Sequence, residues 1–293
     1  MDSEKCAIIL SILKNGSMSA AAQELNYTQS GISRAVEAME RSAGFPILSR
    51  SRGGAHLTRE GEELLPAMRE IAYWSEKYEQ TVQKLRGVQT GKIAVGSSYV
   101  KYFPLLTEIV SGFHEKYPGI SVELCSGTST ELAARMNDRN LDFGIISRRE
   151  GAFSCRVIKR DELVAMLPPK HPLGRCKTIP ATIFESEPYI EIHTGLQTDN
   201  SLCFSERGIN PNISFSTPDS LIACGMVKAG LGVALVNKVI ADELGGSVAY
   251  VPLDPPHIVD ICAVTPPDDI ISPAAKAFET YAMRFISSAA QTL

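Results

Sequence analysis

The chain has 293 residues, 44% of them hydrophobic and 21% charged, which is an ordinary globular composition and long enough for two domains or more. No apolar stretch approaches the about 20 residues of a membrane helix, and no basic leader precedes an apolar run, so we expect a cytoplasmic protein with no membrane partner. A net charge of −4 excludes a protein that coats nucleic acid over its whole surface, but it permits a local basic region.

The sequence carries no recognisable catalytic or metal-binding motif. Its seven cysteines are odd in number and widely spaced, without a C-x-x-C pair, so we expect most of them to be buried thiols and expect neither a disulfide framework nor a zinc site. The five histidines are scattered, and neither a G-x-S-x-G motif nor a phosphate-binding glycine loop occurs. We therefore expect no enzymatic activity, no cofactor and no metal.

The first 27 residues predict two short helices and a break. Apolar residues between positions 7 and 13 predict a helix that Gly16 ends. Ser19 is placed to cap a second helix, whose small residues Ala21 and Ala22 allow another helix to pack closely. Asn26 and Tyr27 then interrupt the helical pattern.

A third helix follows the break and has one polar face. Thr28 is placed as its cap, and an apolar stripe recurs at helical spacing at Ile32, Val36 and Met39. The opposite face carries Gln29, Ser30, Ser33 and Arg34. Two short helices joined by a tight turn are typical of a helix-turn-helix, in which Gln reads adenine and Arg reads guanine in the major groove. The alternative is a helical hairpin whose polar face only meets solvent.

The next segment predicts a basic β-hairpin, or wing. A strand begins at Ile47 and Leu48, a turn follows, and a second strand returns at residues 56–58. Residues 28–59 contain two acidic side chains and five basic ones, at positions Arg34, Arg41, Arg50, Arg52 and Arg59. Because the chain as a whole is acidic, this local excess favours contact with phosphates.

A long helix is predicted from Thr58 onward, and glycines at 87–91 end it. Its apolar seam follows heptad spacing through Leu64, Met68, Ile71, Ser75, Tyr78, Val82 and Leu85. Pro66 lies inside the helix and should kink it or shift its effective start. The seam indicates a dimerisation helix, and the alternative is a helix packed on its own domain.

From Lys92 the pattern alternates between strands and helices. Strands at 93–96, 120–125 and 141–147, with helices at 104–117 and 130–137 between them, predict a parallel βαβαβ sheet. A second set of strands at 162–167, 189–192, 213–216 and 232–236 implies a second α/β lobe. Small-molecule sites in such sheets lie beyond the carboxyl ends of the strands, and these ends are rich in hydroxyl groups here.

Three motifs resemble those of the LysR-type transcriptional regulators. SMSAAAQELNYTQSGISRAVEAME is similar to GSFTAAAxxLxxSQPAVSxxIxxLE, GFPILSRSRGGAHLTREGEELL to GxxLFxRxxxxxxLTxxGxxLL, and GLGVALV to a GLGVxxLP-like segment. Met18 and Leu48 stand where phenylalanine is usual, and Gly31 stands where alanine is usual. The order of the elements resembles the family over nearly the whole chain.

The resemblance implies an α/β protein built of three parts. These are a winged helix-turn-helix at residues 1–58, a linker and dimerisation helix at 59–88, and a two-lobed effector-binding domain at 89–293 that is similar to periplasmic binding proteins. Lobe I would cover about residues 91–148 and 254–293, and lobe II about 149–253. The implied partners are operator DNA, a small effector, and further copies of the chain that form a homodimer and then a tetramer.

The resemblance also implies site residues. Those for DNA are Thr28, Gln29, Ser30, Ser33, Arg34, Arg50 and Arg52. Those for the effector are Ser97, Ser98, Thr128, Ser147 and Thr194. Hydroxyl groups and backbone N–H groups at helix amino termini suit a small carboxylate, so we expect an effector of that kind.

Two other functions remain as alternatives. A solute-binding protein has similar lobes, but it ordinarily carries an export signal. A thiol-based redox sensor would work through Cys203 or Cys224, although the sequence gives neither thiol a neighbouring cysteine.

Overall fold

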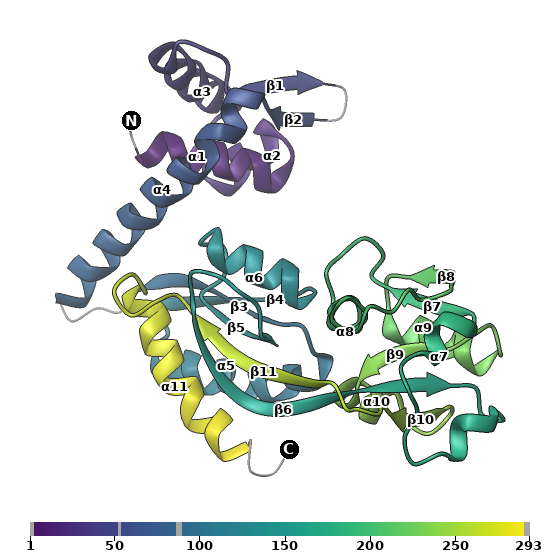
Figure 1. Cartoon of the computed structure of the whole chain (residues 1–293). Coiled ribbons are helices and arrows are strands. Elements are labelled where there is room, and N and C mark those ends of the chain that lie inside the picture. Colours follow the sequence, from purple (N-terminus) through teal and green to yellow (C-terminus); the bar gives the residue numbers. More distant parts are fainter. Residues whose placement is uncertain (1–2, 52–53, 86–89, 290–293) are drawn as a thin grey trace. The chain divides into compact units, whose positions relative to one another are not determined.

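The computed structural model describes residues 3–51, 54–85 and 90–289, and the chain divides into two compact units, Met1–Thr90 and Gly91–Leu293 (Figure 1). The first unit contains three helices, a β-hairpin and a long helix. Their bounds are α1 (Ser3–Asn15), α2 (Met18–Glu24), α3 (Gln29–Ala43), β1 (Leu48–Ser51), β2 (Gly54–Leu57) and α4 (Arg59–Leu85).

The helix-turn-helix is present, with one change in its capping. Ser17, and not Ser19, caps α2, because its side chain accepts a hydrogen bond from the Ala20 N–H. Thr28 caps α3 as predicted, and Asn26 adopts a left-handed φ of 57° in the break between the two helices. The stripe of α3 is buried in a core shared with α1, α2, the hairpin and the start of α4.

The wing is fixed to α3 and α4 by polar contacts. The Glu40 carboxylate accepts hydrogen bonds from the backbone N–H groups of Ile47 and Leu48, at 2.7 and 3.0 Å. Thr58 caps α4 by accepting from the Gly61 N–H, and its hydroxyl donates to the Pro46 carbonyl. A Cβ on Gly61 would lie 2.3 Å from the Ile47 carbonyl oxygen, so only glycine fits there.

The long helix α4 runs through Pro66 without interruption, so the proline does not shift its start. The first half of its seam packs on its own unit, since Met68 is fully buried and Leu64 and Ile71 are partly buried in the same core. In the second half, Tyr78 and Leu85 are exposed, at 66% and 84%, and Ser75 and Val82 are partly buried. The packing of the helix on its own unit therefore accounts for the first half of the seam, and pairing of two chains through the second half stays a prediction.

The second unit begins with lobe I, a sheet covered on both faces. Parallel strands β3 (Gly91–Ser97), β4 (Ile120–Ser126) and β5 (Phe143–Ser147) pair in the order β4-β3-β5, and antiparallel β11 (Ile258–Thr265) adds to β5. Helices α5 (Phe103–Lys116) and α11 (Pro273–Ala289) lie on one face, and α6 (Ser129–Asn137) lies on the other (Figure 1). A short turn η1 (Val100–Tyr102) leads into α5.

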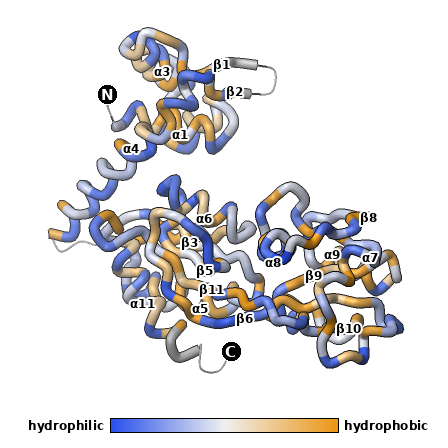
Figure 2. Tube along the Cα trace, in the orientation of Figure 1, coloured by the Kyte–Doolittle hydropathy of each residue, from blue (hydrophilic) through white to orange (hydrophobic). Residues whose placement is uncertain are grey.

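Alternation along the strands explains the two faces. Ile145 points into the core beneath α5 and α11, and its neighbour Ile146 points into the core beneath α6. In the same way, Ile261 points into the core beneath α5 and α11, and Cys262 points into the core beneath α6. Successive side chains of a strand point to opposite faces, so an uninterrupted apolar strand such as FGIIS requires helices on both sides. Figure 2 shows the hydrophobic residues along these central strands.

Lobe II is joined to lobe I through the 14-residue strand β6 (Ser154–Leu167). Its first half pairs with β11, and its second half pairs with β9 (Ala234–Asn237) and β10 (Ala249–Pro252). A separate parallel pair, β7 (Tyr189–Ile192) and β8 (Ile213–Thr217), lies beside them. The lobe is completed by η2 (Pro172–Arg175), α7 (Ile183–Ser186), α8 (Asp199–Arg207), α9 (Ser220–Lys228) and α10 (Lys238–Leu244). The strand predicted at 162–167 is thus only the second half of β6.

Within the described residues, no helix combines the length and the hydropathy needed to span a bilayer.

Candidate functional sites: the α3 face and the interlobe cleft

The polar face of α3 is exposed at its amino-terminal end. Gln29, Ser30 and Arg34 are exposed, and Ser33 is partly buried. The Ser33 hydroxyl donates to Glu37 at 3.2 Å, and the Thr28 hydroxyl caps the helix by accepting from the Gly31 N–H at 3.1 Å. An exposed amide and an exposed guanidinium therefore stand in the first two turns of a helix whose opposite stripe holds it in the core.

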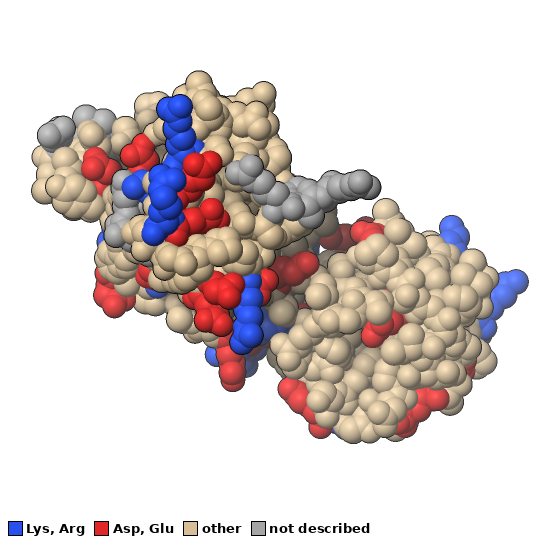
Figure 3. All heavy atoms as spheres, turned by 90° about the horizontal axis from the view of Figure 1, so that it is seen from above, with Lys and Arg blue, Asp and Glu red and all other residues tan. Residues whose placement is uncertain are grey.

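The basic residues of the wing are described only in part. Arg50 lies in β1, where the structure gives its backbone alone, and Arg52 lies outside the described residues. Arg41, near the end of α3, pairs with Glu37 at 3.7 Å. On the face drawn in Figure 3, the Lys and Arg side chains of the described residues stand in separate groups, several of them beside Asp and Glu. This distribution fits the negative net charge of the chain.

The second unit contains a cavity of about 80 Å³ between its two lobes. Lobe I contributes residues from the loop after β3 and from the start of α6, and Arg149 follows β5. Lobe II contributes the loop after β7, the start of α8, and residues from α9, β9 and α10. The lining is Ser98, Tyr99, Thr128, Ser129, Arg149, Ile192, His193, Gln197, Thr198, Asp199, Asn200, Ser220, Leu235, Val236, Asn237 and Ile240.

Three helices direct their amino termini at this cavity, as the lining shows. Thr128 caps α6 in a reciprocal arrangement with Glu131, and Thr198 caps α8 in the same way with Ser201. The third helix, α9, has Asp219 as its cap and contributes Ser220. Hydrogen bonds from Thr128 hold the pKa of Glu131 below its usual range. The positive ends of three helix dipoles therefore meet at one place.

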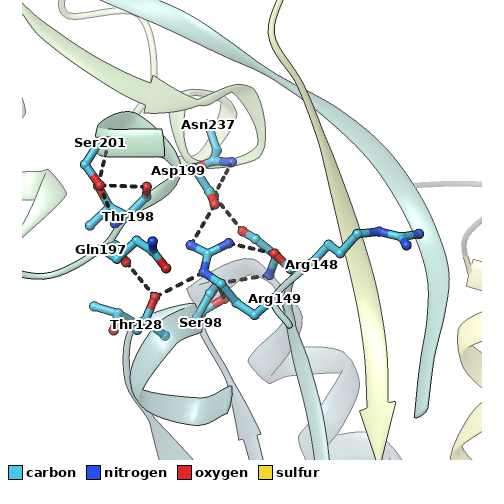
Figure 4. A network of polar contacts seen from close by, with 12 residues as sticks. Ser98, Thr128, Arg148, Arg149, Gln197, Thr198, Asp199, Ser201 and Asn237 are labelled. Carbon is cyan, nitrogen blue, oxygen red and sulfur yellow. Dashed lines mark hydrogen bonds and ion pairs between the residues drawn. The ribbon is translucent and has the colours of Figure 1, made fainter. Parts of the chain in front are cut away.

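A charged and hydrogen-bonded network fills one wall of the cavity (Figure 4). Asp199 accepts hydrogen bonds from Arg149 at 2.9 Å, Ser147 at 2.5 Å and Asn237 at 3.1 Å. Tyr99 lies beside Ser147, with 2.6 Å between the two hydroxyl oxygens. Burial and the Asp199 charge raise the pKa of Tyr99 well above its ordinary value, so this phenol stays neutral.

The structure brings some of the predicted effector residues to the cavity and not others. Ser98 and Thr128 line it. Ser147 lies behind the wall and is bonded to Asp199. Ser97 is buried, and its hydroxyl donates to the Tyr99 carbonyl and accepts from the Tyr99 N–H. Thr194 is exposed and is not part of the lining.

The sequence interpretation missed the charged pair Arg149–Asp199, in which both side chains are about one-tenth exposed. The two residues are 50 positions apart, and no spacing rule connects them. The capping pattern from Thr198 to Ser201 marks the start of α8 and could have drawn attention to Asp199.

The two thiols considered for a redox sensor, Cys203 and Cys224, are buried. Burial raises the pKa of Cys203 to about 11, which keeps this thiol protonated and poorly nucleophilic. Among the described residues, no group of three His, Cys, Asp or Glu side chains is placed to hold a metal ion.

Comparison with known proteins identifies both units. Residues 4–62 match the bacterial regulatory helix-turn-helix protein, lysR family, and residues 86–285 match the LysR substrate binding domain. The uncharacterized regulator YvbU of Bacillus subtilis is 27% identical, over 92% of this chain and 94% of that protein. A full-length OxyR variant from Pseudomonas aeruginosa has a TM-score of 0.72 at 16% identity, covering 99% and 95% of the two chains. Full-length CbnR, solved with its target DNA, has a TM-score of 0.59 at 19% identity, covering 97% and 100%.

An exposed helix-turn-helix and a two-lobed domain with a polar cleft define a class of DNA-binding regulators that carry an effector-binding domain. This chain belongs to the LysR family of bacterial transcriptional regulators. The family consists of regulators and not of enzymes, and its members bind operator DNA and small effectors and form oligomers.

Proposed function

We propose that a small metabolite carrying a carboxylate binds in the interlobe cleft and changes the affinity of this regulator for its operator. The observation that carries the proposal is the convergence of α6, α8 and α9, whose amino termini all contribute to the lining. Helix amino termini present N–H groups and partial positive charge, which favour an anion. The cavity of about 80 Å³ suits a small molecule.

Within this proposal, Ser98 and Thr128 contact the ligand directly. Ser147 acts through Asp199, which it holds in place, and Ser97 supports the loop after β3. Thr194 has no direct part, because it lies outside the lining. These roles follow from where each hydroxyl lies and from the hydrogen bonds it already makes.

On the DNA side, we propose that Gln29 and Arg34 reach base edges. The shorter side chains of Thr28, Ser30 and Ser33 would lie along the sugar-phosphate backbone of the DNA. Arg50 and Arg52 of the wing would contact phosphates, as the local excess of basic residues suggests. We further propose the division into residues 1–58, 59–88 and 89–293. The exposed half of the α4 seam would pair two chains, and the effector-binding domains would join two such dimers into a tetramer.

The test is a thermal-shift screen of the full-length protein against small carboxylates, each matched with its neutral amide. A ligand at 100 times its dissociation constant stabilises the folded state by about 2.7 kcal/mol, so a carboxylate that binds should raise the melting temperature. Its amide should not. Stabilisation by neutral or cationic metabolites alone would contradict the proposed carboxylate. A carboxylate that stabilises the protein must also change its affinity for operator DNA.

A further inference from the structure

The interlobe cleft already contains a carboxylate of its own, that of Asp199. Asp199, the first residue of α8, has three donors from two segments: Ser147 at the end of β5 and Arg149 just after it, and Asn237 at the end of β9. Its side chain is only 10% exposed. A buried carboxylate with this many donors occupies the kind of position in which an anionic ligand would be held.

The partners of Asp199 connect the two lobes. Ser147 belongs to lobe I and donates to Asp199 of lobe II. Arg149 donates its Nε–H to the Thr130 hydroxyl of α6 at 3.0 Å, and that hydroxyl donates to the Gln197 carbonyl of lobe II at 2.5 Å. Figure 4 shows these bonds running from one lobe to the other through the guanidinium. Release of Asp199 from Arg149 and Ser147 would therefore break the direct bonds between α8 and lobe I, and would leave the Thr130–Gln197 hydrogen bond just before α8.

Both members of the ion pair also line the cavity, so a ligand in the cleft can reach the guanidinium. A buried guanidinium cannot be left without an anion at low cost, because an unpaired buried charge is strongly destabilising. If Asp199 leaves, another carboxylate must take its place. Exchange of the Asp199 carboxylate for that of a ligand conserves the net charge around Arg149. The anion that pairs with Arg149 then belongs to the ligand and no longer to lobe II.

We propose that Asp199 is a tethered competitor of the effector, and that the carboxylate of the ligand displaces it from Arg149. This inference rests on the proposed function, since it requires an anionic ligand in the cleft. It makes Asp199 a residue that sets both affinity and response: the pair Arg149–Asp199 links the two lobes of the ligand-free cleft, and exchange breaks that link. A ligand shifts such an equilibrium only through its different affinities for the two states, and competition with Asp199 provides that difference.

The experiment compares the full-length wild type with Asp199→Asn, using acetate as the probe and acetamide as its neutral match, by isothermal titration at constant ionic strength. Asn keeps the size of the side chain and removes the competing charge. We expect acetate to bind Asp199→Asn at least about tenfold more tightly than the wild type, and acetamide to bind both proteins equally. Equal acetate affinities would overturn the inference.

Two further variants separate competition from general electrostatics and from misfolding. Asp242→Asn removes a carboxylate of α10 that pairs with Lys238 outside the cavity, and it should leave acetate affinity unchanged within about twofold. Ser147→Ala removes one donor from Asp199 and should tighten acetate binding in the same direction, which keeps a test available if Asp199→Asn does not fold. The double variant Asp199→Asn with Arg149→Gln should lose acetate binding, and retention would overturn the inference.

The two proposals fail separately. If the wild type binds a carboxylate in the metabolite screen while Asp199→Asn gains no affinity for acetate, the competition is refuted and the carboxylate effector stands. If Asp199→Asn gains acetate affinity while the wild type responds only to neutral metabolites, the exchange site is supported and the carboxylate effector is refuted.

Discussion

The α3 face and the interlobe cleft are built from the chain in opposite ways. The residues of the helix-turn-helix proposed to contact DNA fall within one seven-residue stretch, 28–34, formed by α3 and its cap. The cleft takes its lining from separate segments of both lobes, spread between Ser98 and Ile240. A site on one helix inherits its geometry from helical periodicity, whereas a site made of loop ends inherits its geometry from the packing of the whole domain. The sequence therefore predicts the individual residues of a site on one helix, but only the loops of a site such as the cleft.

The α4 seam offers the strongest test of this comparison, because all of its residues lie on one helix. Among the described residues, the core of the first unit includes only the first half of this seam. Tyr78→Glu should place an unpaired charge in the helix pair, at a cost of at least about 3 kcal/mol, or more than a hundredfold in the dimer dissociation constant. Light scattering at micromolar concentration should show monomers, and DNA affinity should fall.

Thr81→Glu is the matched control, since it adds the same charge to an exposed position of α4 off the seam. It should remain dimeric. A wild-type protein that is monomeric at micromolar concentration would remove the basis for this prediction.

The next effect in size concerns base reading. Arg34→Ala should reduce the preference for operator over random DNA by about 1–3 kcal/mol, if its guanidinium makes a bidentate contact to guanine. Arg41→Ala, on the same helix, and Arg52→Ala, in the wing, should weaken binding to all sequences alike and lower the salt dependence. Binding to a selected operator and to random duplexes, measured at several salt concentrations, separates the two patterns. A uniform loss for Arg34→Ala would show that it contacts only phosphates.

Particular residues show why sequence reasoning succeeded in part. Thr28 and the α3 stripe were predictable, because a cap and a 3.6-residue period are local signals. The parallel sheet of lobe I was predictable, because apolar residues recur along its short strands and amphipathic helices separate them. The first half of β6 was not, since its polar residues 154–161 show no strand pattern and pair only with β11, about 100 residues away. Ser17 and Ser19 both suit a helix cap, and only the geometry decides for Ser17.

In the cleft, the same reasoning identified the loops but not which hydroxyl of each loop faces the ligand. Adjacent serines illustrate this limit: Ser98 lines the cavity, while Ser97 is buried beneath it. One residue of register decides between the two directions, and the sequence carries no signal for that register. Arg149 and Asp199 stayed undetected for the same reason, because tertiary packing alone brings them together.

The two serines turn this limit into a prediction. Ser97→Ala leaves the Tyr99 N–H and carbonyl without their shared hydroxyl partner, so it should lower the free energy of unfolding by about 1–3 kcal/mol without changing ligand affinity. Ser98→Ala should instead weaken binding of a carboxylate found in the screen by about 0.5–1.5 kcal/mol, with a smaller effect on stability. Thermal unfolding and calorimetry on both variants test the assignment. A selective loss of ligand affinity in Ser97→Ala would reverse it.

The smallest expected effect lies in the DNA-binding unit, where a single carboxylate fastens α1 to α2. Glu24 accepts hydrogen bonds from Ser11 and Asn15, each at 2.6 Å, and pairs with Lys14 at 3.2 Å. These contacts, the Ser11 hydrogen bond first, lower the pKa of Glu24 from 4.5 to about 2. Because the folded pKa lies below the unfolded one, the stabilisation is fully present above pH 4.5 and is lost as the pH falls toward 2. Glu24→Gln should therefore unfold at a slightly lower temperature than the wild type at pH 7, and the two should converge near pH 2. The site is partly exposed, so solvent screening keeps the difference small.

Lys14→Gln is the control: the hydroxyl and amide donors remain, so it should keep most of the pH dependence, whereas Ser11→Ala should lose the largest share. Melting curves recorded between pH 2 and 7 test this, and a gap between wild type and Glu24→Gln that persists at pH 2 would contradict it.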